Sequence, residues 1–356
     1  MYYSGIDLHK DNSYITTMDG KGKIIKQERM VNDKGLIVDY FKSIGRKHRS
    51  VVETTSSWYW LCDTLQENKI DVKLAHAKHL KAIAYAKVKT DKVDSKTLAE
   101  LLRTNFIPSA HMISKEKRGL RDLMRTRLRF VRKRTSCYNS IHRIGEKFNC
   151  SMNDYLKSGS IPENLPQEYQ LQIKFLDQQI ELLNTQIKEL EKNLQKVLVP
   201  NEDVQRLLMI PAFGIITSFS VYLEIDGIER FEEVKNFLSY SRVVPGAKDS
   251  NKTKKNKSGN KEGNVYLKIA FTDAAVHAVR YYPEIRDFYN KMRRRTNNAI
   301  ARTLVAKELA KITYYILKEK TEYKGFKGKP ISRQKSQVWP RLRSPRFGLD
   351  NTDPQC

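Results

Sequence analysis

One uninterrupted heptad pattern constrains this chain more than any other feature. Between Ile173 and Val197, apolar residues recur at alternating spacings of three and four, which predicts one long helix with a narrow apolar seam. The seam consists of Ile173, Leu176, Ile180, Leu183, Ile187, Leu190, Leu194 and Val197. β-branched residues at one core position with Leu at the other favour a parallel pair of helices. We therefore expect a coiled coil between chains or domains. The alternative is an intramolecular hairpin with a helix over residues 115–145.

The charge balance indicates a polyanionic partner. The 356 residues include 66 Lys and Arg against 40 Asp and Glu, a net charge of +26. Nucleic acid fits this excess better than a membrane, because no run of about 18 apolar residues exists to span a bilayer and the N-terminus lacks an apolar signal core. The four cysteines lack metal-binding spacing. We expect them to be reduced thiols of a cytoplasmic protein, without structural zinc.

Strand and helix patterns alternate through the first hundred residues. Strands are expected at 2–8, 13–19, 23–31, 50–55 and 71–75, and helices at 34–43, 57–68 and 92–104. Asp19-Gly20 is a hairpin signal between the second and third strands. Three antiparallel strands followed by alternating helix and strand predict an α/β sheet of ribonuclease-H type, which gathers several strand ends at one edge.

Four carboxylates stand at the ends of these elements. Asp7 and Glu53 each close an apolar run, and Asp91 and Asp94 lie three apart at a helix start, so they face one side of it. Acids that end buried strands are costly unless paired or bound to a cation, and hard divalent ions prefer carboxylate oxygens. Each acid alone has a structural explanation, as a helix cap or a surface ion pair. As an ordered set, they predict a metal site.

A basic stripe follows on the helix expected from Lys115 to His142. Its arginines recur at spacings of three and four, and across Lys117–Arg134 only Asp122 opposes them. The stripe consists of Arg118, Arg121, Arg125, Arg129 and Arg132. Surface helices ordinarily mix charges, so this pattern favours phosphate contact. The alternative is a solvated basic face over a core helix.

The region after Asn201 predicts a mostly helical domain. Helices are expected at 231–239, 262–280, 283–292 and 298–318. The stretch Ile210–Thr217 resembles the turn of a helix-hairpin-helix, whose backbone amides can hold a DNA phosphate, although Ala212 stands where glycine is expected.

A polar, lysine-rich segment at 245–264 interrupts these helices. It carries Ser250 and Ser258, and a serine in a cationic loop can attack phosphorus. The alternative is a solvated linker that binds phosphate nonspecifically. The predicted RNA or DNA contacts of this segment are Lys252, Lys254, Lys255, Lys257 and Lys261.

Taken together, the motifs resemble the DEDD-plus-serine insertion-sequence transposases, often called the "IS one-ten" family and described as bridge-RNA-guided DNA recombinases. The N-terminal similarity lies in Gly5–Lys10, Val52–Thr55 and Lys89–Ser95. The C-terminal similarity lies in Ile210–Gly214, Phe231, Val244–Pro245, Lys261–Lys268 and Ala274–Ala275. The resemblance extends from residue 1 to about residue 320.

The resemblance implies a three-part organisation with a basic tail. The expected parts are a RuvC-like domain at 1–112, a basic helix, linker and coiled coil at 113–200, a transposase domain at 201–322 and a disordered tail at 323–356. Two Mg²⁺ ions, with Mn²⁺ as a substitute, are implied at the four acids. The implied catalytic serine is followed by glycine; counting from the flanking motifs places it at Ser250, although Asn251 follows it. Ser258-Gly259 keeps the pair at another distance.

The resemblance also implies an activity and partners. We expect a DNA recombinase of the prokaryotic cytoplasm, associated with the nucleoid, that acts through a covalent protein–DNA ester. A guide RNA would select the DNA, and the chain would form a dimer or a dimer of dimers. Two rivals remain: a metal-dependent junction nuclease that uses water, and a catalytically inactive nucleic-acid-binding protein.

Overall fold

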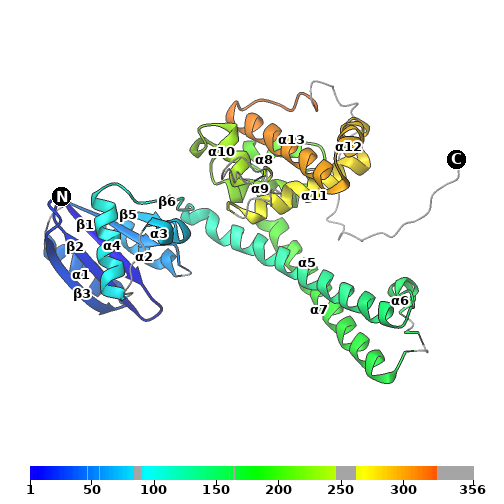
Figure 1. Ribbon diagram of the computed structural model, residues 1–356, viewed down its shortest axis with the longest axis horizontal. Coiled ribbons are helices and arrows are strands. Elements are labelled where there is room, and N and C mark those ends of the chain that lie inside the picture. Colours follow the sequence, from blue (N-terminus) through cyan, green and yellow to red (C-terminus); the bar gives the residue numbers. More distant parts are fainter. Residues whose placement is uncertain are drawn as a thin grey trace, which may run out of the picture. The chain divides into compact units, whose positions relative to one another are not determined.

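A computed structural model describes residues 1–45, 47–55, 57–83, 90–159, 161–162, 165–245 and 262–326 of the chain. The chain forms two compact units, Met1–Lys115 and a second that begins at Glu116. Their helices and strands are labelled in Figure 1. Each unit is described separately below.

The first unit is a six-stranded mixed sheet with helices on both faces. Its strands are β1 (Tyr2–Leu8), β2 (Asn12–Met18), β3 (Ile24–Val31), β4 (His48–Glu53), β5 (Asp71–Ala75) and β6 (Ser109–Ala110). They lie in the order β3-β2-β1-β4-β5-β6, with β1 antiparallel to β2 and parallel to β4. The five expected strands are confirmed. The kinship to ribonuclease H and RuvC stays a prediction, because strand order alone does not establish it.

Four helices cover this sheet, and they are α1 (Lys34–Ile44), α2 (Trp58–Glu67), α3 (Ala77–Ile83) and α4 (Asp91–Arg103). Ile6 and Val52 share one buried cluster with residues of α1 and α2. Val51 shares a second cluster with Leu98 of α4. Because neighbouring residues of a strand point to opposite faces, α4 lies on the face opposite to α1 and α2. The short α3 and β6 were not expected from the sequence.

Gly5 is the point where α4 lies directly on β1. A Cβ atom at this position would stand 2.1 Å from the carbonyl oxygen of Ser95 and 2.4 Å from the amide nitrogen of Ala99. Beside it, the hydroxyls of Thr16 and Ser95 form a buried hydrogen bond of 2.7 Å. Glycine is therefore required here by the close approach of the helix backbone, and this contact sets the position of α4 on the sheet.

The second unit begins with a long helical hairpin. Its helices are α5 (Lys115–Lys147), α6 (Asn153–Ser158) and α7 (Gln167–Val197). Polar contacts join α5 and α7 at three levels, namely Arg127 with Glu191, Arg134 with Asn184 and Cys137 with Gln179. In these pairs the residue number rises along α5 as it falls along α7, so the two helices run antiparallel.

This hairpin corrects the expectation for the heptad seam. Ile173, Ile180 and Leu183 are buried in one cluster with Cys137 and Ile141 of α5. Most of the seam therefore packs within the chain, which is the alternative, while Val197 at its end is 52% exposed. The predicted parallel pairing between chains does not describe the buried part. Heptad spacing specifies an apolar line on a helix, but the connection through α6, residues 148–166, supplies an antiparallel partner from the same chain.

A helical bundle completes the second unit. Its elements are α8 (Glu202–Leu208), α9 (Ile215–Ile225), the short 3₁₀ helix η1 (Ile228–Arg230), α10 (Val234–Tyr240), α11 (Val265–Tyr281), α12 (Pro283–Arg295) and α13 (Asn298–Lys318). Phe213, Phe237, Phe271 and Leu309 are buried in its core. The four helices expected after residue 230 are confirmed within a few residues at their ends. In the described part of the chain, no helix combines the length and the apolar character needed to cross a bilayer.

Candidate active site

Three of the four predicted acids meet where β1 ends and α4 begins. Asp7 is the penultimate residue of β1, and Asp91 and Asp94 occupy the first turn of α4. Thr90 caps this helix, because its hydroxyl accepts a hydrogen bond from the amide of Val93. The cap starts the helix at Asp91, and the close packing at Gly5 brings that start toward the end of β1.

Glu53 lies at the neighbouring strand end. Val52 of β4 pairs with Ile6 of β1 in parallel register, so Glu53 follows one residue later beside Asp7. Val51 packs toward α4, and Glu53, two residues on, faces the same side of the sheet. All four acids therefore belong to one end of the unit, on the face covered by α4.

Sequence reasoning missed His9 as a member of this site. Its Nε2 lies 3.1 Å from Oδ2 of Asp7 and 3.3 Å from Oδ1 of Asp91. Ligand atoms of these three residues all lie within 4.8 Å of one another. The available signal was its position two residues after Asp7, which directs both side chains to one side of an extended backbone.

The electrostatics of the site favour a bound cation. The pKa of Asp7 is raised, first by burial and then by the charges of Asp94 and Asp91, while His9 acts in the opposite direction. Carboxylates gathered closely enough to oppose one another's ionisation lower their energy by sharing a positive ion. Carboxylate oxygens are also the ligands preferred by hard divalent ions, so the donors present fit a divalent metal.

The second predicted site lies outside the described residues. This holds for Ser250 and Ser258 and for the predicted contacts Lys252, Lys254, Lys255, Lys257 and Lys261. The two ends of the segment are described. The amide of Asn264 donates a hydrogen bond to the carbonyl of Tyr240. Gly263 has a φ of +99°, and a Cβ there would stand 2.4 Å from the same carbonyl oxygen, so the return point requires glycine.

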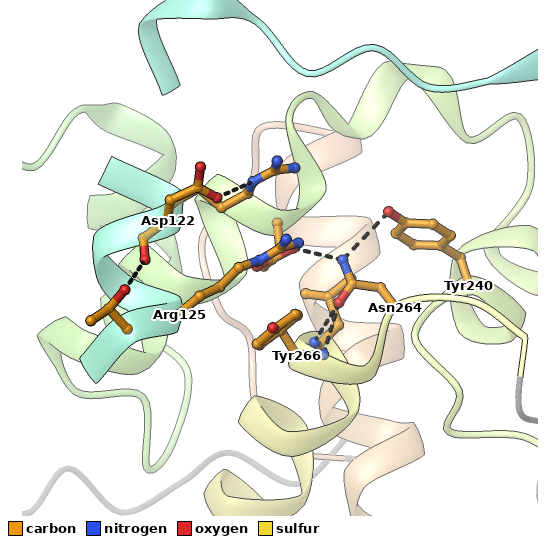
Figure 2. Close-up of polar contacts among 9 residues, drawn as sticks. Asp122, Arg125, Tyr240, Asn264 and Tyr266 are labelled. Atoms are coloured by element: carbon orange, nitrogen blue, oxygen red, sulfur yellow. Dashed lines mark hydrogen bonds and ion pairs between the residues drawn. The ribbon is translucent and has the colours of Figure 1, made fainter. Parts of the chain in front are cut away.

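A buried polar network holds this return point, as Figure 2 shows. Asn264 caps α11 because its side-chain oxygen Oδ1 accepts hydrogen bonds from the first backbone amides of the helix. Its side-chain nitrogen Nδ2 donates a hydrogen bond of 2.7 Å to Glu224. Arg125 of α5 donates two hydrogen bonds to the same carboxylate, at 2.6 and 2.7 Å. Its guanidinium also lies over the ring of Tyr266, 4.2 Å from the centroid. The network therefore joins α5, α9 and the start of α11.

Comparison with known proteins finds family models that match an N-terminal and a C-terminal part of the chain. A family model described as "Transposase", of the DEDD type of IS110, matches residues 4–145. A second, described as "Transposase IS116/IS110/IS902 family", matches residues 204–290. The chain belongs to the IS110 family of transposases. The first match contains all four acids, and the second contains both ends of the lysine-rich segment.

Curated relatives agree with this family. The transposase for insertion sequence element IS1111A of Coxiella burnetii is 24% identical over 78% of this chain and 78% of its own length. A probable family 20 transposase of Pseudomonas aeruginosa is 22% identical over 90% of this chain and 98% of its own. The transposase for insertion sequence element IS1328 of Yersinia enterocolitica is 22% identical over 68% of this chain and 73% of its own length. The protein is thus a DNA transposase, and the DEDD family suggests dependence on a divalent metal.

The structure divides the basic stripe of this transposase into two groups. Arg118 is 6% exposed, the guanidinium of Arg125 is hydrogen-bonded to Glu224, and Arg121 lines the same pocket as Arg125. Arg129 and Arg132 are exposed. Phosphate binding by the stripe stays a prediction. The exposed pair fits that prediction, whereas Arg125 already has an acidic partner within the chain.

The turn resembling a helix-hairpin-helix joins α8 to α9. Ala212 adopts a φ of +64°, in the left-handed region where glycine is favoured. The expectation that glycine suits this position is therefore explained by the backbone. Phosphate binding by this turn stays a prediction.

Proposed function

We propose that this transposase cuts and rejoins DNA through a serine nucleophile, assisted by Mg²⁺ at the four acids and directed by a structured RNA. The observation that carries the proposal is the meeting of Asp7, Asp91 and Asp94 at one end of the first unit, beside the strand end at Glu53. The water-using nuclease and the inactive binding protein become outcomes of the tests below.

Each group has a defined role in the proposed reaction. The four acids hold the metal, which when bound neutralises charge on the phosphate and favours ionisation of the nucleophile. The Oγ of Ser250 forms a bond to phosphorus as the bond to the leaving deoxyribose oxygen breaks. The serine loses its proton and the leaving oxygen gains one. The resulting ester conserves the phosphodiester free energy, so the reverse attack rejoins DNA without ATP.

Two features of the described chain support a functional role for the serine segment. The end of α10 at Tyr240 is joined to the far end of the segment by the hydrogen bond to Asn264, and Asn264 is held by the buried carboxylate of Glu224. A rigid base is what a nucleophile on a loop requires, because a displacement of about 1 Å can cost a large factor in rate. Ser250 is proposed as the nucleophile and Ser258 as its control.

Self-assembly requires a surface other than the heptad seam. Leu171, Phe175 and Leu182 of α7 are 51, 54 and 58% exposed, and their spacings of four and seven place them along one side of the helix. We assign homo-dimer formation to this side. Replacing Leu171 and Leu182 with Lys should reduce the mass measured by light scattering, whereas Ile180→Lys, in the buried seam, should instead lower the unfolding temperature.

The acids are tested by separating binding from cleavage. Asp7→Asn and Glu53→Gln, singly or together, should abolish strand cleavage and leave nucleic-acid binding nearly intact, because carboxylates without metal repel phosphate. Gel shift and cleavage of labelled DNA with guide RNA and Mg²⁺ measure the two properties. Normal recombination by the double variant would refute the metal-site proposal. Wild-type binding without cleavage at any Mg²⁺ concentration would favour the inactive binding protein.

The serine is tested by trapping the covalent product. Denaturing electrophoresis of protein with labelled DNA, guide RNA and Mg²⁺ should show a slow, protease-sensitive band that Ser250→Ala abolishes and Ser258→Ala retains. A band lost only in Ser258→Ala would move the nucleophile to Ser258. Cleavage by the wild type without any such band would favour the nuclease that uses water.

A further inference from the structure

His9 is held in place by its backbone on both sides. Its amide donates a hydrogen bond to the carbonyl of Asn12 at 3.0 Å, and its own carbonyl accepts one from the side chain of Asn32 at 2.9 Å. Asn32 in turn accepts a hydrogen bond of 2.6 Å from the hydroxyl of Ser13. The residue after the end of β1 is therefore fixed relative to the sheet, although its side chain is 53% exposed.

The distances around the His9 ring suit neighbouring ligands of one metal ion. Adjacent ligands of an octahedral ion, each about 2.1 Å from the metal, stand about 3 Å apart. The Nε2 atom of His9 lies 3.1 Å from a carboxylate oxygen of Asp7 and 3.3 Å from one of Asp91. The nitrogen thus has the spacing of a neighbouring ligand to each of the two oxygens, and all three atoms lie within 4.8 Å of one another.

A nitrogen ligand changes which metal the site prefers. Carboxylate oxygens suit Mg²⁺ and Mn²⁺, whereas imidazole nitrogen suits transition metals and adds little for Mg²⁺. A site with carboxylates alone would rely on metal abundance to select Mg²⁺. A site with two carboxylates and an imidazole gains affinity for Mn²⁺ and the metals that follow it in the series.

We propose that His9 is a ligand of the metal held by Asp7 and Asp91, and that it gives the site a preference for Mn²⁺ over Mg²⁺. This inference rests on the proposed metal site. It goes beyond it by adding a ligand that the four-acid pattern does not contain and by naming the metal class that this ligand selects.

The test measures metal ligation directly in the full-length protein. Pulsed electron paramagnetic resonance of bound Mn²⁺ detects coupling to a ligating imidazole nitrogen, and isothermal titration measures Mn²⁺ and Mg²⁺ affinity. Wild type should show the nitrogen coupling, and His9→Gln should lose it. Because even supporting residues of metal sites change affinity by about 10–100-fold, His9→Gln should weaken Mn²⁺ binding at least about tenfold and Mg²⁺ binding much less.

Two controls accompany this experiment. His111→Gln removes another exposed histidine of the same unit that does not belong to the Asp7 cluster, and it should leave coupling and affinities unchanged. Asp7→Asn should abolish Mn²⁺ binding. Thermal unfolding of metal-free His9→Gln should match wild type, since the side chain is half exposed.

The outcomes separate this inference from the proposed function. Bound Mn²⁺ that depends on Asp7 but shows no nitrogen coupling would overturn the role of His9 and leave the acid site standing. Coupling that persists in His9→Gln would also overturn it, because another histidine would be the ligand. Mn²⁺ binding that is absent in wild type, or unaffected by Asp7→Asn, would overturn the metal site itself.

Discussion

The acids of the first unit and the arginines of α5 are both regularly spaced charges, but the structure surrounds them differently. Asp7, Asp91 and Asp94 approach one another, and among the described residues the basic side chain of His9 contacts Asp7 and Asp91. Arg125 and Arg127 instead each meet a buried carboxylate of the same chain. Like charges brought together need an external counter-charge, whereas a paired charge has already been neutralised. This difference in pairing is why we assign ligand binding to the acids and a structural role to Arg125 and Arg127.

The most damaging change to the acid site should be Gly5→Val. The new side chain would collide with the backbone of α4, and relieving that collision moves the helix start that carries Asp91 and Asp94. We expect a loss of about 3 kcal/mol or more in unfolding free energy and no stabilisation by Mn²⁺. Thermal unfolding with and without metal measures both.

Gly20→Ala is the matched control in the same unit, because a Cβ there meets no atom within 4 Å. It should retain stability and the metal response. A Gly5→Val protein with normal metal-dependent stabilisation would show that the packing of α4 does not position the acids.

The next largest effect should be on unfolding free energy, and it should differ between the ion-paired Arg125 and the exposed Arg129. Arg125→Ala leaves the carboxylate of Glu224, which is 4% exposed, without its charged partner. Breaking such a buried pair costs about 3–5 kcal/mol, so denaturant unfolding should show a loss of that order. Arg129→Ala, on the exposed side, should change stability by less than about 0.5 kcal/mol. Equal stability of the two variants would contradict the division of the stripe.

The exposed pair should act through counterion release. Changing Arg129 and Arg132 together to Ala should reduce the slope of log affinity against log salt by about two units, one for each phosphate that an arginine no longer neutralises. Titration of labelled RNA and DNA at several salt concentrations gives the slope. A weaker affinity with an unchanged slope would mean that these arginines support the fold rather than bind phosphate.

The smallest effect concerns the turn between α8 and α9. Ala212→Gly removes the strain of a side chain at a φ of +64° and should raise unfolding free energy by up to about 1 kcal/mol. Thermal unfolding of the purified protein measures it. Ala110→Gly, in β6, is the control and should not stabilise. A destabilised Ala212→Gly protein would mean that the methyl group contributes more through packing than the backbone strain costs.

Local patterns predicted most of this fold because the signals were local. The strands of the first unit and the helices after residue 230 follow from apolar periodicity, turn residues and caps. The partner of the heptad seam did not follow, since an apolar line on α7 fits a second chain as well as α5. The role of Arg125 depended on Glu224, which is 99 residues away and has no sequence signal that links it.

The placement of the acids at one end of the sheet was predictable for a related reason. Asp7 and Glu53 end neighbouring strands, and strand ends are visible in the sequence even when their contacts are not. His9 was not recognised, because an exposed histidine after a strand has many roles and its relation to Asp91 arises only when α4 packs at Gly5.

The hydrogen bond between Tyr240 and Asn264 fixes the span that the intervening chain must bridge. The free-energy cost of closing a loop rises by only about 0.6 kcal/mol for each doubling of its length. A change in the length of the intervening chain should therefore leave the folding free energy of the bundle almost unchanged.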